Sequence, residues 1–213
     1  MSNCNCPLPA LVDIQTAESC PFDIRQIQRV YVTKKTNTSF PMTIASTDPA
    51  DAATWTALVA TAVTDVTKVV MTPLIGGEPT IEGGNPLTLG GGSNETLNGA
   101  PENTGREASL FSCVFRSRPI DVMRKLKDLE CHDLMVFFID DAERIHGVST
   151  DGGTTFTGIP VDGKSWFVSD RTNQGFNSKD TNGCQFSLKG RWDDYLYTVS
   201  TASTFNPLSL YPA

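Results

Sequence analysis

Few residues of the types that most often perform chemistry occur in this sequence. There are only two histidines, His132 and His146, which is little material for a histidine-based triad or a multi-histidine metal site. Together with Cys131 and Asp133 they could in principle supply metal ligands. However, neighbouring residues at a helix end or in a strand point in different directions, and no CxxC or HxxxH motif accompanies them. We expect His132 to lie near the C-terminal dipole of a helix instead.

The cysteines are a second set of chemically capable side chains. The sequence has six of them, Cys4, Cys6, Cys20, Cys113, Cys131 and Cys184. The three nearest the N-terminus could bind zinc or cross-link subunits, but a fourth local ligand for zinc is missing. Residues 1–10 show neither the basic nor the apolar region of a signal peptide, so disulfides lack a supporting export signal. We expect reduced thiols that pack as small apolar groups.

Paired carboxylates could perform acid–base catalysis or bind calcium. Such pairs occur at Asp140-Asp141 and Asp193-Asp194, but adjacent acids in turns between strands usually face water. The run Gly90-Gly91-Gly92 lacks the Gly-Lys-Ser/Thr ending of a phosphate-binding loop, which favours a flexible spacer. We therefore predict no catalytic residue, no metal site and no cofactor. An enzyme built from carboxylates that the fold brings together stays an open alternative.

Three tryptophans, Trp55, Trp166 and Trp192, could form a sugar-stacking platform on a β sandwich. Such a platform would be typical of a carbohydrate-binding module. Trp166 and Trp192 fall within predicted strands, however, where large aromatic side chains more often fill a core or a subunit contact. The structural role is therefore the preferred interpretation.

The composition predicts one globular domain. Of 213 residues, 39% are hydrophobic and 19% are charged, which is apolar enough to bury one core. A formal net charge of -7, with few clustered basic residues, argues against tight binding of nucleic acid. An acidic surface suits a protein that stays soluble or lets DNA pass without sticking. No stretch approaches the roughly 20 consecutive apolar residues that span a bilayer, so we expect no membrane partner.

The expected secondary structure is mainly β, with an extended arm over residues 1–22 and a single β-rich domain over 23–213. Alternating patterns and β-branched runs predict strands over 24–33, 63–72, 108–116, 134–139, 143–148, 165–169, 184–191 and 195–200. The continuous apolar run 134–139 is typical of a central strand buried on both faces. Turn signals, including Asn182-Gly183, favour an antiparallel meander in the last third of the chain.

Two helices and one long loop interrupt these strands. Asp48-Pro49 is a helix start, and the spacing of apolar residues after it predicts a short helix over 49–62. An amphipathic pattern behind a second start signal predicts a helix over 118–131. Gly- and Pro-rich residues 76–105 predict a long loop or an irregular hairpin, and loops of that length are uncommon unless they bind, cover or remain disordered. The predicted fold is an antiparallel β barrel or sandwich with one flanking α-helix.

The order of these segments is similar to that of virion structural proteins of phages that infect Bacteroidetes. The resemblance lies in a Gly- and Asn-rich segment over 90–99, a Pro-started helix over 118–131, a buried strand over 134–139 and the antiparallel strands that follow. It covers roughly residues 60–200 and is greatest, in order of elements, to tail tube proteins. The N-terminal arm has no counterpart in it.

The resemblance implies a structural protein of the virion, not an enzyme. Tail tube subunits form rings, in this case hexamers, that stack into a hollow conduit for DNA ejection. The implied partners are further copies of the chain, the neck, baseplate and tape measure proteins, and the sheath where a tail is contractile. DNA would pass through the lumen without specific binding.

Specific segments of this chain can be assigned roles by the same resemblance. In such tubes the strands of adjacent subunits continue one sheet around the lumen, while a long loop and the terminal arms clamp neighbouring rings. Residues 76–105 and 2–22 have too little apolar content to pack internally, so we expect them to be the clamps. The net negative charge predicts a lumen that repels phosphates.

Two other classes of protein share the β-rich, acidic character of this sequence. A capsid decoration, head fibre-base or neck protein would bind other virion proteins without forming tubes. A carbohydrate-binding β-sandwich module would bind glycans as a monomer, and an export signal would be expected for it.

Overall fold

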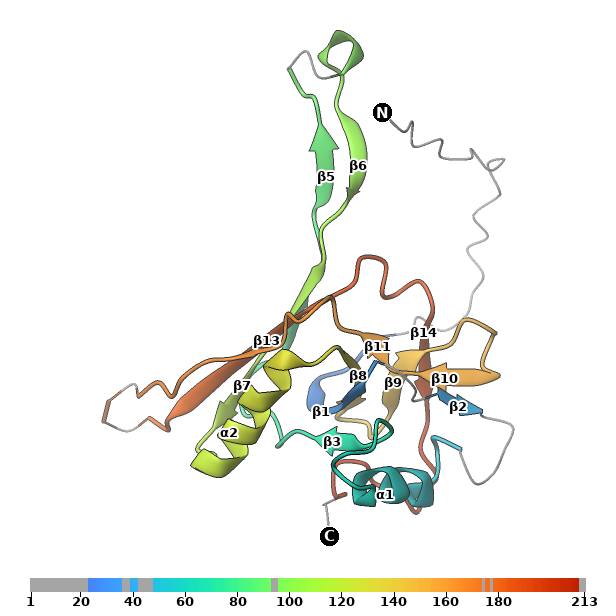
Figure 1. Cartoon of the computed structure of the whole chain (residues 1–213), viewed down its shortest axis with the longest axis vertical. Helices are drawn as coiled ribbons and strands as arrows, with labels where there is room; N and C mark the ends of the chain where they lie inside the picture. Colours follow the sequence, from blue (N-terminus) through green and yellow to red (C-terminus); the bar gives the residue numbers. More distant parts are fainter. Residues whose placement is uncertain are drawn as a thin grey trace.

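The computed structural model describes residues 23–35, 39–41, 48–92, 96–173, 175–176 and 178–210, and of 39–41 it describes the backbone alone. The predicted arm over 1–22 lies outside these described residues. The chain forms a mainly β structure of two antiparallel sheets, a projecting hairpin and two α-helices (Figure 1). No helix among the described residues is long and apolar enough to cross a membrane.

The large sheet has eight strands. Its order is β2-β10-β9-β8-β1-β3, with β11 beside β8 and β14 beside β9, and every pairing is antiparallel. The strands are β1 (Ile27–Lys34), β2 (Ser39–Pro41), β3 (Val69–Met71), β8 (Leu134–Asp140), β9 (Ile145–Val148), β10 (Thr155–Thr157), β11 (Ile159–Pro160) and β14 (Leu196–Val199).

The small sheet has four strands in the order β12-β13-β7-β4. They are β4 (Thr80–Glu82), β7 (Ser109–Arg116), β12 (Phe167–Val168) and β13 (Thr181–Leu188). Between β4 and β7 the chain runs out and back as a two-stranded hairpin, β5 (Pro86–Leu89) and β6 (Glu102–Arg106), which stands clear of both sheets in Figure 1. The described strands do not close into a barrel, so of the two predicted architectures the sandwich is confirmed.

The main core lies between the two sheets. Alternate residues of β7 and β13 point inward, so Phe111, Phe115 and Phe186 meet Val136 and Phe138 of the large sheet, and all of these side chains are buried. Ring centroids of Phe111 and Phe138 lie 5.0 Å apart. Burying aromatic side chains of this size supplies much of the hydrophobic free energy of such a domain.

A second core covers the opposite face of the large sheet. Helix α1 (Ala52–Ala60) and the C-terminal segment lie on that face, where Trp55 makes edge contacts with Tyr31 and Phe137 at centroid distances of 5.2 Å each. Asp51 caps α1 by accepting a hydrogen bond from the backbone N–H of Ala53. The predicted short helix is therefore confirmed, with both ends slightly inside the predicted bounds.

Helix α2 (Ile120–Lys127) begins after Pro119 and continues into a 3-10 turn over Asp128–Cys131. Its buried side chains, Met123 and Leu126, pack into the main core, and the Leu126 carbonyl accepts a hydrogen bond from the Trp166 indole at 3.0 Å. The predicted flanking helix over 118–131 is confirmed in position and in its amphipathic character.

Several predicted elements differ from the observed ones. The strand expected over 63–72 is only Val69–Met71, because residues 61–68 form turns whose backbone is tied by Asp65. Asn182-Gly183 is not a turn but lies within β13, which pairs with β7 along its full length. The last third is not a simple meander, because β13 belongs to the small sheet and β14 to the large one. The segment 76–105 is a hairpin with β4, β5 and β6, which corresponds to the second of its two predicted forms.

Candidate assembly surfaces

The buried residue His146 has the partners of a structural group. Its Nε2 lies 3.0 Å from Asp140 Oδ2, and its Nδ1 lies 2.7 Å from Thr198 Oγ1. This order of hydroxyl, imidazole and carboxylate is the same as in a catalytic triad. However, His146 and Asp140 are completely buried, and neither they nor Thr198 lines any of the cavities described below. The cluster therefore joins β8, β9 and β14 and has no substrate access.

The protonation of this cluster follows from burial and its hydrogen bonds. Burial lowers the pKa of His146 below 6.5, although the bond to Asp140 works in the other direction. Burial works to raise the pKa of Asp140, but hydrogen bonds from Arg144 and His146 outweigh it and lower that pKa. Arg144 lies over the carboxylate, with a nitrogen–oxygen distance of 2.6 Å. At neutral pH the cluster is thus an ionised carboxylate held by an arginine and a neutral imidazole.

The predicted metal-site candidates are not brought together. His132 is exposed at the end of the turn after α2, while His146 is buried in the large sheet. No group of three or more potential metal ligands occurs within the described residues. Cys4, Cys6 and Cys20 lie outside those residues.

The remaining cysteines and carboxylate pairs occupy separate environments. Cys113 and Cys184 are buried cross-strand neighbours on β7 and β13, and their mutual contact and burial raise the pKa of the Cys184 thiol. Asp141 pairs with Arg25 at 3.3 Å, and Asp194 pairs with Arg191 at 2.6 Å. Neither arrangement places two carboxylates around one reacting centre.

The tryptophans do not form a sugar-binding platform. Trp55 is 0% exposed and Trp166 is 2% exposed, so neither indole can stack on a ligand. Trp192 lies in the turn after β13, not in a strand, and is partly buried against the main core. The expected structural role is confirmed for Trp55 and Trp166. Gly90-Gly91-Gly92 lies near the tip of the hairpin and has positive φ at each residue.

The outer face of the small sheet is a regular surface that no other described element of the chain covers. In β7 buried side chains alternate with half-buried or exposed ones, and β13 has the same alternation. Most outward side chains are small or polar, and among them the two charges, Glu82 and Arg116, are of opposite sign. The outward residues are Thr80, Glu82, Leu110, Ser112, Val114, Arg116, Phe167, Thr181, Gly183, Gln185 and Ser187.

The two sides of the small sheet differ. Among the described strands, β4 pairs only with β7. The Glu107 N–H donates to the Asn85 carbonyl, and from this pair the hydrogen-bonded pairs of the two antiparallel strands recur at every second residue. By this alternation the amide of Glu82 points away from β7, toward the open edge. On the other side, β12 is two residues long and the Val168 amide donates to the Glu130 carboxylate at 3.2 Å. Helix α2 and its following turn therefore shield that side, while the β4 side is open.

The hairpin projects from the end of the small sheet and has no core of its own. Every side chain of β5 and β6 is exposed, including Leu87 at 45% and Leu89 at 40%, and Leu97 near the tip is 83% exposed. Isolated two-stranded hairpins are marginally stable in water, so an uncovered one of this kind gains stability from contact with another surface.

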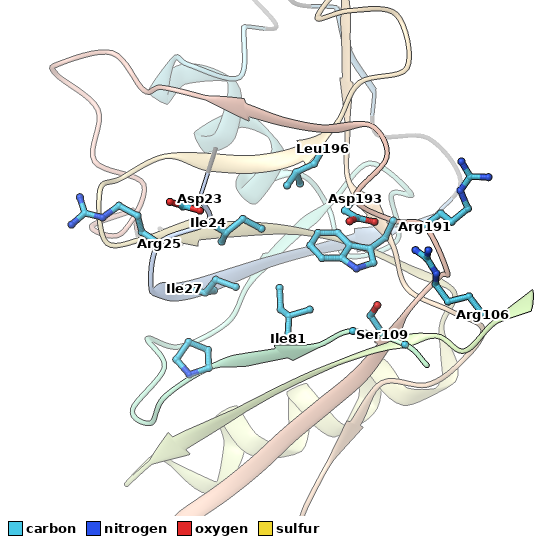
Figure 2. A pocket seen from close by; sticks show the side chains of 14 residues that line it. Asp23, Ile24, Arg25, Ile27, Ile81, Arg106, Ser109, Arg191, Asp193 and Leu196 are labelled. Atoms are coloured by element: carbon cyan, nitrogen blue, oxygen red, sulfur yellow. The ribbon is translucent and has the colours of Figure 1, made fainter. Parts of the chain in front are cut away.

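A cavity of about 500 Å³ lies at the base of this hairpin (Figure 2). Its floor is formed by apolar side chains from both sheets, among them Ile27, Ile81 and Leu196, which point toward one another in Figure 2. Its rim carries charged groups of both signs. They are Asp23, Arg25, Arg106, Arg191 and Asp193. Sequence reasoning missed this cavity, because it arises where four separate chain segments meet.

A second, more apolar groove of about 650 Å³ lies between β3 and α2, with Val70, Met71 and Leu129 among its lining residues.

Comparison with known proteins adds no identification: no family model matches the chain, and no curated protein matches it either.

Proposed function

We propose that this protein is the tube subunit of a bacteriophage tail. The observation that carries the proposal is the small sheet, one face of which packs on the core. The other face is regular, carries mostly small or polar side chains with few charges, and is not covered by other described elements. A smooth sheet of that kind suits the wall of a channel through which DNA slides without being gripped.

Copies of the chain join side by side in this account. The open β4 edge of one copy lies against the β12 and α2 side of the next, where it displaces the Glu130 carboxylate from the Val168 amide, so the small sheets continue around a lumen. Because two different surfaces meet, the contact is head-to-tail and generates a ring when the rotation closes. Rings of six copies, as in tail tube proteins, then stack into a tube in the virion.

The hairpin over 86–106 fits the clamp between stacked rings, because its exposed leucines need a partner surface. The ends of the tube would meet neck and baseplate proteins, its lumen the tape measure protein and then DNA, and its outside a sheath where the tail contracts. The net negative charge of the chain predicts a lumen that repels phosphates. In the proposed tube the outer strand residues of the small sheet line the lumen, and their charges, Glu82 and Arg116, balance, so the lining would be close to neutral.

Electron microscopy of negatively stained protein, over a range of concentrations and beside sedimentation velocity, tests the proposal. Rings or hollow tubes of uniform diameter are expected, with tubes increasing as concentration rises. A protein that stays monomeric at every concentration would contradict the tube role and leave capsid decoration as the alternative, to be tested by capsid binding. Binding to glycans by the monomer would instead support the carbohydrate-binding class.

A further inference from the structure

Two cysteines lie directly opposite each other on the two long strands of the small sheet. Cys113 of β7 and Cys184 of β13 are Cα partners in the antiparallel pairing of these strands, which lie side by side in Figure 1. Both side chains belong to the main core, where they are 4% and 2% exposed. The two thiols are free and are joined to each other by a hydrogen bond. The core of the small sheet therefore contains a pair of thiols in contact.

The backbone around this pair has the spacing that a disulfide needs. The Ser117 N–H donates to the Asp180 carbonyl at 2.8 Å, and hydrogen-bonded pairs of antiparallel strands recur at every second residue. By that alternation Cys113 and Cys184 form a hydrogen-bonded pair. The Cα atoms of such a pair lie about 5.5 Å apart, and disulfides usually join Cα atoms about 4.4–6.8 Å apart. The sulfur atoms can therefore be joined without a change of strand register.

We propose that Cys113 and Cys184 form a redox site, which closes into a disulfide within one subunit when the folded protein meets a peroxide. The inference does not depend on the proposed tube function. One sulfur, as the thiolate, attacks a peroxide oxygen, and the O–O bond breaks to give a sulfenic acid and a water. The other thiol attacks the sulfenic sulfur, the S–O bond breaks and a second water leaves. Two thiols and one hydrogen peroxide thus give one disulfide and two waters.

The disulfide should be reversible, because the pair is slightly too wide for a relaxed bond. Facing Cβ atoms on antiparallel strands lie about 4.5–5.5 Å apart and are closest in pairs without hydrogen bonds, whereas those of a disulfide lie about 3.5–4.5 Å apart. Closure therefore draws β7 toward β13, and strained disulfides are more easily reduced. The hydrogen bond with Cys113 and burial raise the pKa of Cys184, so closure should be slow at neutral pH and faster in alkaline buffer.

The disulfide would join the two strands whose outer face no described element covers. It would close a loop of about 70 residues, from Cys113 to Cys184, that includes α2 and the central strand β8. Closing a loop of this length restricts the unfolded chain. We expect the oxidised subunit to unfold about 5 °C higher than the reduced one, with the strain in the bond reducing the gain.

Peptide mapping of the wild-type protein tests the site. Folded protein is incubated with hydrogen peroxide at several pH values, remaining thiols are blocked with iodoacetamide in urea, and the protein is digested with trypsin. Cleavage after arginine and lysine gives peptides 107–116 and 180–189, each with one of the two cysteines. We expect a linked species that is lighter than the two free peptides together by two hydrogen atoms. Dithiothreitol should separate it into those peptides.

Two variants show whether the same bond causes the change in stability. Cys113→Ala removes one partner and should abolish both the linked peptide and the rise in unfolding temperature on oxidation. Cys131→Ala, at an exposed cysteine, is the matched control and should alter neither. Each variant is compared with its own sample kept reduced, so any effect of the substitution on the starting stability is subtracted.

Three results would overturn the inference. Peptides 107–116 and 180–189 that stay separate, while Cys131 is oxidised in the same sample, would show that the paired thiols do not bridge. A linked species that forms only when peroxide is added in urea would show that the folded pairing does not make the bond. An equal rise in unfolding temperature in Cys113→Ala would assign the stabilisation to oxidation elsewhere in the chain.

Discussion

The two sheets differ in what covers them, although they share one core. The central strand of the large sheet, β8, is buried at all seven residues because the small sheet lies on one side and α1 with the C-terminal segment on the other. The equivalent strand of the small sheet, β7, is buried only at alternate residues. Both faces of the large sheet are therefore packed inside the protein, while one face of the small sheet is left uncovered by the described residues. This difference assigns stability to the first sheet, and in the proposed function it leaves the second sheet free to take part in assembly.

The largest effect separating the two sheets is expected for Phe137→Ala. Phe137 is fully buried and its ring packs against Trp55 and Phe156, so its truncation leaves a cavity and should lower the free energy of unfolding by about 3–5 kcal/mol. Leu110→Ala, on the outer face of β7, should cost less than about 1 kcal/mol. Urea unfolding of both variants at one pH measures the difference. Equal losses would contradict the division between the two sheets.

The adjacent acids Asp140 and Asp141 provide a second comparison within the large sheet. Asp140→Asn removes the charge that Arg144 and His146 bind in the interior, and we expect a loss of about 3–5 kcal/mol. Asp141→Asn breaks only the solvent-exposed pair with Arg25, which is worth about 0–1 kcal/mol. Thermal unfolding followed by circular dichroism checks both. A mild effect of Asp140→Asn would mean that the cluster is not the junction of β8, β9 and β14.

Arg29 holds the C-terminal segment on the face of the large sheet that lies opposite the small sheet. Its guanidinium donates to the carbonyls of Thr72 at 2.9 Å and Leu210 at 2.8 Å, and so holds the C-terminal segment down. Arg29→Lys cannot reproduce this fork and should cost about 1.5–3 kcal/mol. Tyr31→Phe, which loses one hydrogen bond to the Pro207 carbonyl, should cost about 1 kcal/mol. Burial raises the pKa of Tyr31 to about 12, so that bond persists in alkaline buffer. Proteolysis of the C-terminal segment gives an independent reading.

The pH dependence of unfolding should come from His146. Because burial lowers its pKa in the folded state, the unfolded chain binds a proton first as pH falls below about 6.5. The histidine is neutral in both states at higher pH, so no stability is lost there. Between pH 6.5 and about 5, above the range in which carboxyl groups such as Asp140 titrate, the free energy of unfolding should fall by less than about 1.4 kcal/mol per pH unit. The slope should vanish in His146→Gln and persist in His132→Gln, which replaces the only other histidine.

The smallest effect on folding, and the sharpest on assembly, is expected at the open edge of the small sheet. Glu82→Pro removes an amide that points away from β7, so the subunit should change its free energy of unfolding by less than about 0.5 kcal/mol. In the proposed ring, lateral pairing of copies needs that amide, so the Glu82→Pro variant should form rings only at higher concentration. Glu82→Gln keeps the amide and loses only the charge. Sedimentation velocity of the two variants separates the roles, and identical profiles would remove β4 from the interface.

The interior of the fold was largely predictable from sequence. The run Leu134–Asp140 has too many consecutive apolar residues to face water on either side, and α2 has a clear amphipathic period. The register of β1 was not predictable, because an irregularity between Ile27 and Arg29 places Ile27 on the same face as Val30. That shift also buries Arg29, whose partners come from segments far away in the chain.

The candidate surfaces were less predictable, for a physical reason. The alternation in residues 109–116 could have indicated that one face of that strand is free, but the same pattern is typical of any half-exposed strand. Asn182-Gly183 has the composition of a hairpin turn, yet long pairing with β7 overrides that local preference. The cavity at the hairpin base depends on four segments meeting in space, and no local pattern encodes it.

Hydrogen–deuterium exchange of β4 in free and assembled protein tests the central claim most directly. If copies continue the small sheet from one to the next, peptides spanning Thr80–Glu82 and Phe167–Val168 should exchange more slowly after assembly, while α1, on the far side of the large sheet, stays unchanged. Slower exchange confined to α1, with β4 unchanged in the assembled form, would contradict the account.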